Sequence, residues 1–274
     1  MCRAIHRRDP QRPEFWYLSF TAPHPPVWPL QTYLDLYRDI DIALPVVGEW
    51  ARDTAALRDA PGHEVELARR ALYATLTHID HQLRVVIGCL REEGLLDNAI
   101  IAFTSDHGDM RGDHGRWAKT LMFEMSAEIP LIIVPAEGDG RLEVGNVDDR
   151  LTTLYDLMPT LLDMAGISIP ASVEGHSLLS RERGEILYGE HWEGDHATHM
   201  VRDHRHKLIY YPVGNNLQLF DLDNDRREER DLASCLYGDD LAWVSDGKLV
   251  GEPDRDSVPP RHRDLSGQCG IRFV

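Results

Sequence analysis

The sequence predicts an α/β protein with a small antiparallel subdomain behind its main part. In the first 175 residues, short apolar runs alternate with stretches of helical periodicity, which is typical of helices packed on a sheet. After about Gly175 the pattern changes to brief strand-like pieces separated by polar turns. From Ser245 the chain is rich in Pro, Gly, Asp and Arg. We therefore expect an α/β domain over 1–175, the antiparallel subdomain over 176–244 and an extended tail over 245–274.

The elements of the amino-terminal half follow from composition and periodicity. Residues 14–20 mix aromatic and apolar side chains and predict a strand, and the proline-rich residues 22–29 predict a rigid loop after it. Between 64 and 93 apolar residues recur at helical spacing, and Gly94 predicts the end of that helix. The apolar run 99–103 then predicts a buried parallel strand, which delivers the side chains that follow it to the carboxyl edge of a sheet.

In the second half of the chain, strand and helix patterns alternate up to about residue 166, and only strand-like pieces follow. Pro130 opens an apolar strand over 131–134, and the apolar spacing over 152–165 predicts a helix that packs back on the sheet, with Gly166 as its cap. The antiparallel subdomain contains three strand-like pieces, which are residues 186–188, 207–211 and 218–220.

The segment that follows the run 99–103 carries the chemistry of an ion site. Asp106 and His107 come directly after the strand and offer a hard oxygen and an imidazole nitrogen, which suit a divalent metal. Lys119, at the end of the same glycine-rich segment, offers a cation for an anionic group held by that metal. From the residues alone, a turn-forming Asp, a surface His and a solvated Lys remain the simpler interpretation.

This segment resembles the sulfatase family, the branch of the alkaline-phosphatase-like hydrolases that includes arylsulfatases, choline sulfatases and phosphonate monoester hydrolases. The matching stretches are residues 105–110 with 112–115 and Lys119, 19–26 with Tyr33, 128–133, and 219–225 with 231–232. They occur in the family's order along roughly residues 14–235. The resemblance implies a central mixed sheet flanked by helices, with a small carboxyl-terminal antiparallel subdomain.

The resemblance also implies roles for four residues. Asp106 and His107 match metal ligands of the family, with Ca²⁺ as the first choice and Mn²⁺ or Mg²⁺ left open. Lys119 matches a lysine that binds an oxygen of the sulfate or phosphoryl group and stabilises charge as the ester bond breaks. His24 matches a histidine that faces the substrate and protonates or hydrogen-bonds the leaving-group oxygen. Lys119 and His24 are thus the expected catalytic and substrate-binding residues.

Other polar residues are expected to play supporting parts. The spacing of Asp109, Asp113 and His114 fails the pattern of a calcium loop, so we expect them to hydrogen-bond the loop backbone and to hold the ligands in place. Five histidines of the subdomain are expected at exposed polar positions, with the first, at a strand end, the one to watch. They are His191, His196, His199, His204 and His206.

The implied activity is metal-dependent hydrolysis of sulfate esters by a formylglycine nucleophile, which the family makes from a Cys-x-Pro/Ala-x-Arg motif behind a strand with paired aspartates. Neither motif is present here, because Cys2 is followed by His6 where the arginine is required. We therefore expect this chain to correspond to the carboxyl-terminal portion of such an enzyme. Two alternatives remain open: a phosphonate monoester or phosphodiester hydrolase on the same scaffold, and a non-catalytic remnant.

Composition limits the partners. The formal net charge is −17 and the isoelectric point about 5.2, which argues against nucleic acid and anionic membrane as partners and leaves a small sulfate or phosphoryl ester as substrate. No signal-peptide pattern or apolar membrane span is found, so the expected location is cytoplasmic. An exposed apolar edge is expected to favour assembly with a complementary amino-terminal chain or another copy. The cysteines are expected as reduced thiols, at Cys2, Cys89, Cys235 and Cys269.

Overall fold

The computed structural model describes residues 1–52, 62–180 and 184–233. The tail expected over 245–274 lies outside the described residues, as do Cys235 and Cys269. Among the helices of the described part, none is both long enough and apolar enough to cross a membrane.

The longest element is helix α4 (Gly62–Glu92), which confirms the helix predicted over 64–93. It ends as expected at Gly94, whose φ of +64° is a left-handed conformation that glycine adopts without steric cost. The N–H of Leu95 then donates to the carbonyl of Leu90 at 2.8 Å, which satisfies a carbonyl that the end of the helix would otherwise leave without a partner.

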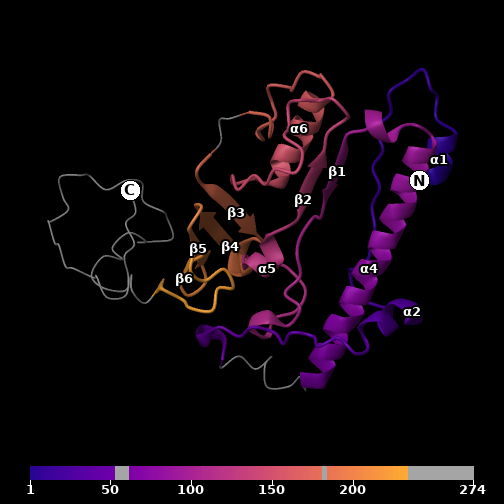
Figure 1. The fold of residues 1–274 in the computed structure, drawn as a ribbon. Helices are drawn as coiled ribbons and strands as arrows, with labels where there is room; N and C mark the ends of the chain where they lie inside the picture. Colours follow the sequence, from indigo (N-terminus) through magenta and orange to yellow (C-terminus); the bar gives the residue numbers. More distant parts are fainter. Residues whose placement is uncertain (53–61, 181–183, 234–274) are drawn as a thin grey trace, which may run out of the picture.

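Two short helices pack on α4, which Figure 1 shows running down one flank of the molecule. Helix α1 (Cys2–His6) buries Ile5 against Cys89, close to the carboxyl end of α4. Helix α2 (Gln31–Leu34) lies against the middle of α4, where Tyr33 stacks on a histidine ring. The amino-terminal segment is therefore anchored to the carboxyl-terminal half of this helix.

The two strands predicted around the ion-site segment are confirmed, but their pairing differs from the expectation. Strand β1 (Ile101–Thr104) pairs antiparallel with β2 (Leu131–Val134), and Phe103 lies opposite Ile132. The expectation of a buried parallel strand over 99–103 was wrong. A parallel pair needs a crossover connection, whereas the chain between β1 and β2 turns back through a loop and one short helix. Phe103 and Ile132 are 38% and 56% exposed, so one face of this pair is open.

The strand predicted over 14–20 was also wrong. These residues are extended but pair with no other strand among the described residues. An aromatic-rich composition favours an extended backbone, yet a strand forms only where a neighbour supplies its hydrogen bonds. Phe15 and Tyr17 are 77% and 83% exposed.

The helix predicted over 152–165 is shorter than expected. It begins as a 3₁₀ turn, Leu154–Asp156, and continues as α6 (Leu157–Met164). The start is set by a capping box, in which the carboxylate of Asp156 accepts the N–H of Thr153 at 2.9 Å. Gly166 ends the helix with a φ of +71°, as predicted.

The antiparallel sheet predicted after Gly175 is confirmed, with one strand more than expected. It is a meander in which each strand pairs with the next, in the order β3-β4-β5-β6. The strands are β3 (Leu187–His191), β4 (Thr198–Arg202), β5 (His206–Tyr211) and β6 (Asn216–Asp221). Those predicted over 186–188, 207–211 and 218–220 correspond to β3, β5 and β6, whereas β4 was missed.

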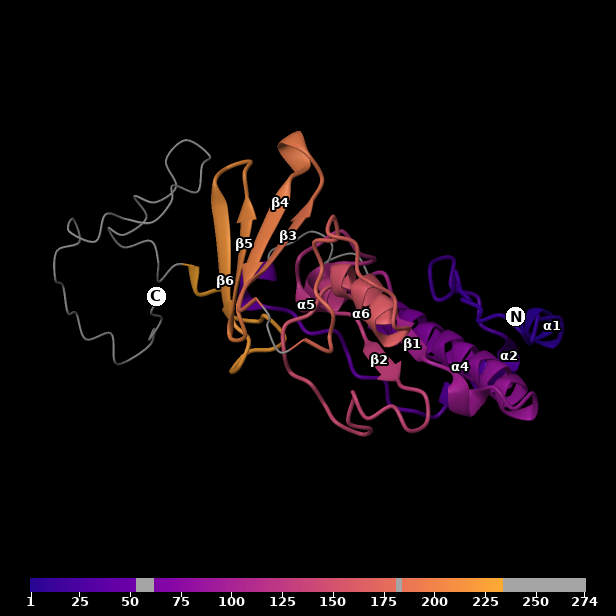
Figure 2. The same cartoon turned by 90° about the horizontal axis from the view of Figure 1, so that it is seen from above.

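One hydrophobic core joins this sheet to the segment after β1. Met110 of that segment and Phe123 pack with Ile209 and Phe220 of the sheet, and Trp50 covers the cluster. Helix α5 (Glu124–Ala127) lies between the two sheets, as Figures 1 and 2 show from two directions. The domain boundary expected at 175–176 stays a prediction, since these two parts share side-chain contacts.

Candidate functional site

The predicted metal ligands lie at the carboxyl end of β1. Asp106 is 84% exposed at its side chain, and its Oδ1 accepts the N–H of His107 at 3.1 Å. The His107 ring contacts the carbonyl of Gly108 through Nδ1 at 2.7 Å. A carbonyl oxygen can only accept, so Nδ1 carries the proton and the lone pair of Nε2 is left for another partner.

His107 Nε2 lies 3.6 Å from Asp106 Oδ2. Two ligands that each lie about 2.2 Å from one ion, about 110° apart, are about 3.6 Å from each other. The two donors therefore fit a divalent metal as a pair. Among the described residues, no group of three or more His, Cys, Asp or Glu side chains is placed to hold an ion.

The predicted catalytic residues meet in space although 95 positions separate them. Lys119 Nζ lies 2.6 Å from His24 Nε2, while His24 Nδ1 lies 2.8 Å from the carbonyl of Pro25. The contact with Pro25 requires the proton on Nδ1, so Nε2 accepts from the ammonium of Lys119. The structure thus brings a cation and a basic imidazole nitrogen together at an exposed position.

The backbone around Lys119 is unusual. Ala118 and Thr120, on either side of it, both have left-handed conformations, with φ of 63° and 77°. Non-glycine residues rarely adopt these values, and such positions cluster at functional sites because the surrounding structure holds them there. The N–H of Met110 donates to the carbonyl of Ala118 at 2.7 Å, which ties this turn to the buried part of the loop.

Asp113 and His114 tie the loop to the backbone of the 46–50 segment, and their expected role in holding the metal ligands stays a prediction. Both are buried, at 1% exposure. Asp113 accepts the N–H of Val46 at 3.1 Å, and its carboxylate lies 3.4 Å from Arg69 and 3.2 Å from Arg227. The carboxylate therefore connects α4, the 46–50 segment and the chain after β6 to one point of the loop.

His114 is a packed and neutral partner in the same region. Its Nδ1 accepts the N–H of Gly48 at 3.0 Å, and its ring lies against Trp50 and Phe123. Burial lowers the pKa of His114, because the apolar surroundings disfavour the charged ring. Asp109, the third supporting residue, caps its own turn by accepting the N–H of Arg111 at 2.9 Å.

Two residues of this support were missed at the level of the sequence. Arg69 lies on the apolar face of α4, three residues before Leu72, and its burial at 4% shows that its charge serves Asp113. A charged residue on an otherwise apolar helix stripe was the available signal. Arg227 carried no comparable signal, since it lies in the charged turn after β6.

Cys2 has no part in this loop. It packs with Cys89 near the carboxyl end of α4, whereas Arg69, which holds Asp113, is twenty residues earlier on the same helix. At about 1.5 Å per helical residue, the two places are about 30 Å apart. Cys2 and Cys89 are both free thiols, as predicted for these two.

The histidines of the antiparallel sheet are occupied locally. His191 lies edge-on to Trp192. The ring of His199 is stacked between the rings of Tyr188 and Tyr210, and its Nδ1 shares a 2.8 Å hydrogen bond with the hydroxyl of Tyr188. His196 and His204 are exposed as expected, whereas His191, His199 and His206 are partly buried, so the expectation of exposed positions was wrong for these three.

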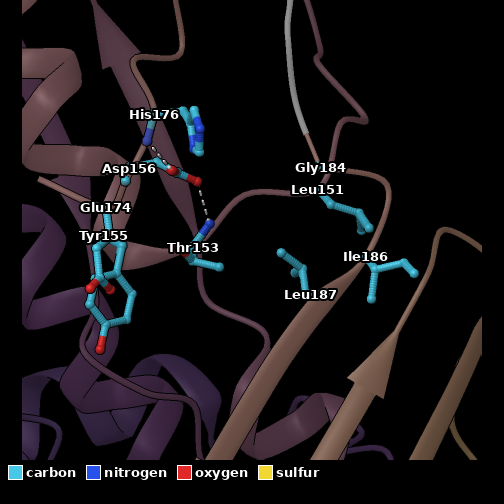
Figure 3. Close-up of a pocket in the computed structure, with 10 residues that line it drawn as sticks. Leu151, Thr153, Tyr155, Asp156, Glu174, His176, Gly184, Ile186 and Leu187 are labelled. Atoms are coloured by element: carbon cyan, nitrogen blue, oxygen red, sulfur yellow. Dashed lines mark hydrogen bonds between the residues drawn. The ribbon is translucent and has the colours of Figure 1, made fainter. Parts of the chain in front are cut away.

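A cavity of about 270 Å³ lies elsewhere, between the start of α6 and β3. Figure 3 shows Leu151, Ile186 and Leu187 on one side and Asp156 with His176 on the other. The carboxylate of Asp156 is engaged by the backbone N–H groups of Thr153 and His176 at 2.9 and 2.8 Å. The polar groups of this cavity thus serve the local fold, and none of its lining residues belongs to the 105–120 loop.

Comparison with known proteins identifies the chain's relatives. The family model described as "Sulfatase" matches residues 3–167, and "N-sulphoglucosamine sulphohydrolase, C-terminal" matches 112–240. An arylsulfatase of Clostridium perfringens is 38% identical over 240 residues, covering 82% of this chain and 50% of the arylsulfatase. The chain spans about half the length of this relative.

Solved structures agree. The phosphonate monoester hydrolase of Silicibacter pomeroyi matches with a TM-score of 0.66 and 25% identity, over 77% of this chain and 50% of the hydrolase. A protein solved in complex with its substrate D-glucosamine-2-N,6-O-disulfate matches with a TM-score of 0.69 and 20% identity, over 86% of this chain and 64% of the other. These likenesses confirm the fold class expected from the resemblance.

Proposed function

Because this chain belongs to the sulfatase family, we propose that its 105–120 loop, together with His24, forms the part of a sulfuric ester hydrolase that binds the sulfate group. The observation that supports this most directly is the 2.6 Å contact between Lys119 Nζ and His24 Nε2. An ammonium and an imidazole from distant segments meet at an exposed position, where a small anion can reach both.

Lys119 and His24 have different roles in cleaving the ester. The ammonium of Lys119 binds an oxygen of the sulfate group and neutralises the charge that develops there as the ester bond breaks. His24, whose ring is oriented by the carbonyl of Pro25, presents Nε2 toward the same position. Once Nε2 has taken a proton, it donates that proton to the oxygen of the departing alcohol.

We propose Asp106 and His107 as ligands of the divalent metal on which the family depends. A hard carboxylate oxygen beside an imidazole nitrogen suits Ca²⁺ first, with Mn²⁺ or Mg²⁺ as alternatives. When bound, the metal supplies Lewis acidity and a fixed point for a sulfate oxygen. In this proposal the fixed Nδ1–H tautomer keeps the Nε2 lone pair of His107 available, and Asp106 provides the negative charge that a cation needs.

Turnover and binding measured separately test this proposal. The chain is assayed with 4-nitrophenyl sulfate, and sulfate binding is followed by calorimetry. Lys119→Met is expected to abolish sulfate binding, and to lower any kcat/KM that the unchanged chain shows by about 10²–10³-fold. Arg116→Met is the matched control, because it removes a positive charge from the same loop at an exposed position and leaves Lys119 in place. Sulfate binding that is unchanged in Lys119→Met would refute the assignment, whether or not the chain turns over.

The phosphonate monoester hydrolase likeness favours a second candidate on the same scaffold. Lys119 and His24 would serve a phosphonate monoester in the same way, because its transferred group also carries anionic oxygens. Relative kcat/KM for 4-nitrophenyl sulfate and 4-nitrophenyl phenylphosphonate separates the two. A preference of more than about tenfold for the phosphonate, or about 1.4 kcal/mol in the transition state, would favour the second candidate.

A further inference from the structure

A cluster of four charged side chains lies between the antiparallel sheet and helix α5, and three of them, Lys207, Glu124 and Glu228, are buried. Lys207 of β5 and Glu228 are 0% and 1% exposed at their side chains, and Lys207 Nζ lies 2.9 Å from Glu228 Oε1. The same ammonium lies 2.5 Å from Glu124 Oε1 and donates to the carbonyl of Met122 at 2.8 Å. Arg202 of β4 donates to both carboxylate oxygens of Glu124 at 2.8 Å.

The cluster is balanced, with two positive and two negative side chains. Burial raises the pKa of Glu124, but the ion pairs with Lys207 and Arg202 outweigh it, so that the pKa lies below its ordinary value. For Glu228 burial prevails over Lys207 and the pKa is raised. Buried ion pairs of this kind add little stability compared with apolar residues of similar size, and their best-attested use is to fix one arrangement of the chain.

The arrangement fixed here is that of α5. Glu124 is the first residue of this helix, and its N–H donates to Glu228 Oε2 at 2.7 Å, so both its backbone and its side chain are held by the cluster. Lys207 contacts α5 through Glu124, and it also contacts Met122, which lies two residues before the helix begins. A helix of only four residues has few bonds of its own, so its place depends on these contacts.

Helix α5 in turn holds the loop at the predicted metal ligands. The carbonyl of Ser126 accepts the N–H of Gly108 at 2.8 Å. The backbones approach so closely that a Cβ on Gly108 would lie 2.2 Å from the carbonyl oxygen of Met125. The carbonyl of Gly108 accepts a hydrogen bond from Nδ1–H of His107 at 2.7 Å. A continuous set of contacts thus leads from Lys207 through α5 and Gly108 to the His107 ring.

We propose that Lys207 is a positioning residue for His107: it fixes α5, α5 fixes the Gly108 peptide, and the Gly108 carbonyl fixes the ring and tautomer of His107. The importance of this for a bound metal rests on the proposed function, whereas the contacts themselves do not. The antiparallel sheet therefore acts on the predicted metal site although none of its side chains is needed as a ligand.

Amide hydrogen exchange tests the proposal without metal or substrate, so its result does not depend on whether the chain hydrolyses any ester. In protein labelled with ¹⁵N-glycine, Gly108 reports the contact with α5. Gly112 reports the same loop through its own bond to the carbonyl of Arg116, at 2.8 Å, and that part of the loop is anchored by Asp113. Lys207→Met is compared with Arg205→Met, which removes an ion pair of the same sheet that does not contact α5.

The expected result is selective. In Lys207→Met the protection of the Gly108 amide falls at least tenfold while that of Gly112 is unchanged, and in Arg205→Met neither changes. The ¹⁵N shifts of His107 at about pH 9, where imidazole is neutral, are expected to move from the Nδ1–H tautomer toward a mixture only in Lys207→Met.

Equal loss of protection at Gly108 and Gly112 would overturn the proposal, because it would show only a general loss of stability. Unchanged protection at both would overturn it as well. If Lys207→Met does not fold, Glu124→Gln decides by the same criteria, since it removes the carboxylate that joins Lys207 and Arg202 to α5 while Lys207 stays paired with Glu228.

Discussion

Replacing Gly108 by alanine is expected to destabilise the protein through contact between two backbones. The added Cβ would lie 2.2 Å from the carbonyl oxygen of Met125 and 3.2 Å from that of Glu128. Carbon and oxygen atoms normally stay about 3.3 Å apart, so the loop and α5 must separate by about 1 Å. That movement breaks the 2.8 Å bond between Gly108 N–H and the Ser126 carbonyl.

The cost can be estimated term by term. Overpacking costs about 1–3 kcal/mol and the lost hydrogen bond about 1 kcal/mol. The smaller conformational freedom of alanine in the unfolded chain returns about 0.4–1 kcal/mol. Gly108→Ala should therefore lower the free energy of unfolding by about 1–3.5 kcal/mol, which lowers Tm by about 2–4 °C for each kcal/mol.

Gly140 supplies the matched control, because a Cβ there meets nothing within 4 Å and its φ is not left-handed. Urea titrations and thermal scans of Gly108→Ala and Gly140→Ala, side by side, measure the difference. If the two variants unfold within about 0.5 kcal/mol of each other, the close approach of the loop to α5 is wrong, and with it the route by which α5 holds His107.

Three further predictions concern the same region and the sheet beside it. Asp113→Ala leaves the buried Arg69 without its partner, so unfolding in urea should become easier by about 3–5 kcal/mol; an effect below 1 kcal/mol would mean that the pair is not buried as described. Thr120→Gly relieves a left-handed backbone at a β-branched residue and should raise stability by about 1 kcal/mol while weakening sulfate binding; lower stability would contradict the strain. The hydrogen bond from Arg205 holds the pKa of Asp221 well below its ordinary 3.8, so the carboxylate stabilises the fold above that pH and its contribution is lost as pH falls further. Asp221→Asn should therefore lower the urea midpoint at about pH 6 and clearly less at about pH 2, and an equal loss at both would exclude the ion pair as the cause.

Local signals predicted the two longer helices, α4 and α6, but not the short helices α1, α2 and α5 or the strand pairing. Helix α4 has a strong periodic pattern and a glycine stop, so both its existence and its end could be predicted. Strand direction depends on where the chain goes between β1 and β2, and composition does not encode that path. Strand β4 was missed because its residues, Thr-His-Met-Val-Arg, are apolar at only two of five positions.

Some residues of the candidate site could be predicted from the sequence, and others could not. The resemblance singled out His24 and Lys119 separately, and only the folded chain shows them in contact across 95 positions. Arg69 could have been suspected from its place on an apolar helix face. The cluster of Lys207 with Glu124 and Glu228 could not, because the burial of these residues depends on the packing of three separate segments that the local sequence does not bring together.

The meander of β3 to β6 has a consequence for the order of folding. Every strand pairs with its neighbour in sequence, so each hairpin closes a short loop and pays little chain entropy before its contacts form. The contacts between Lys207 and Glu124 join residues 83 positions apart and require a much larger closure. We expect the meander to form early and α5 to dock on it later. Pulsed hydrogen exchange during refolding should therefore show protection of the Ile209 amide before protection of the Gly108 amide. The ligand-bearing loop would then be among the last parts of the chain to reach its final geometry.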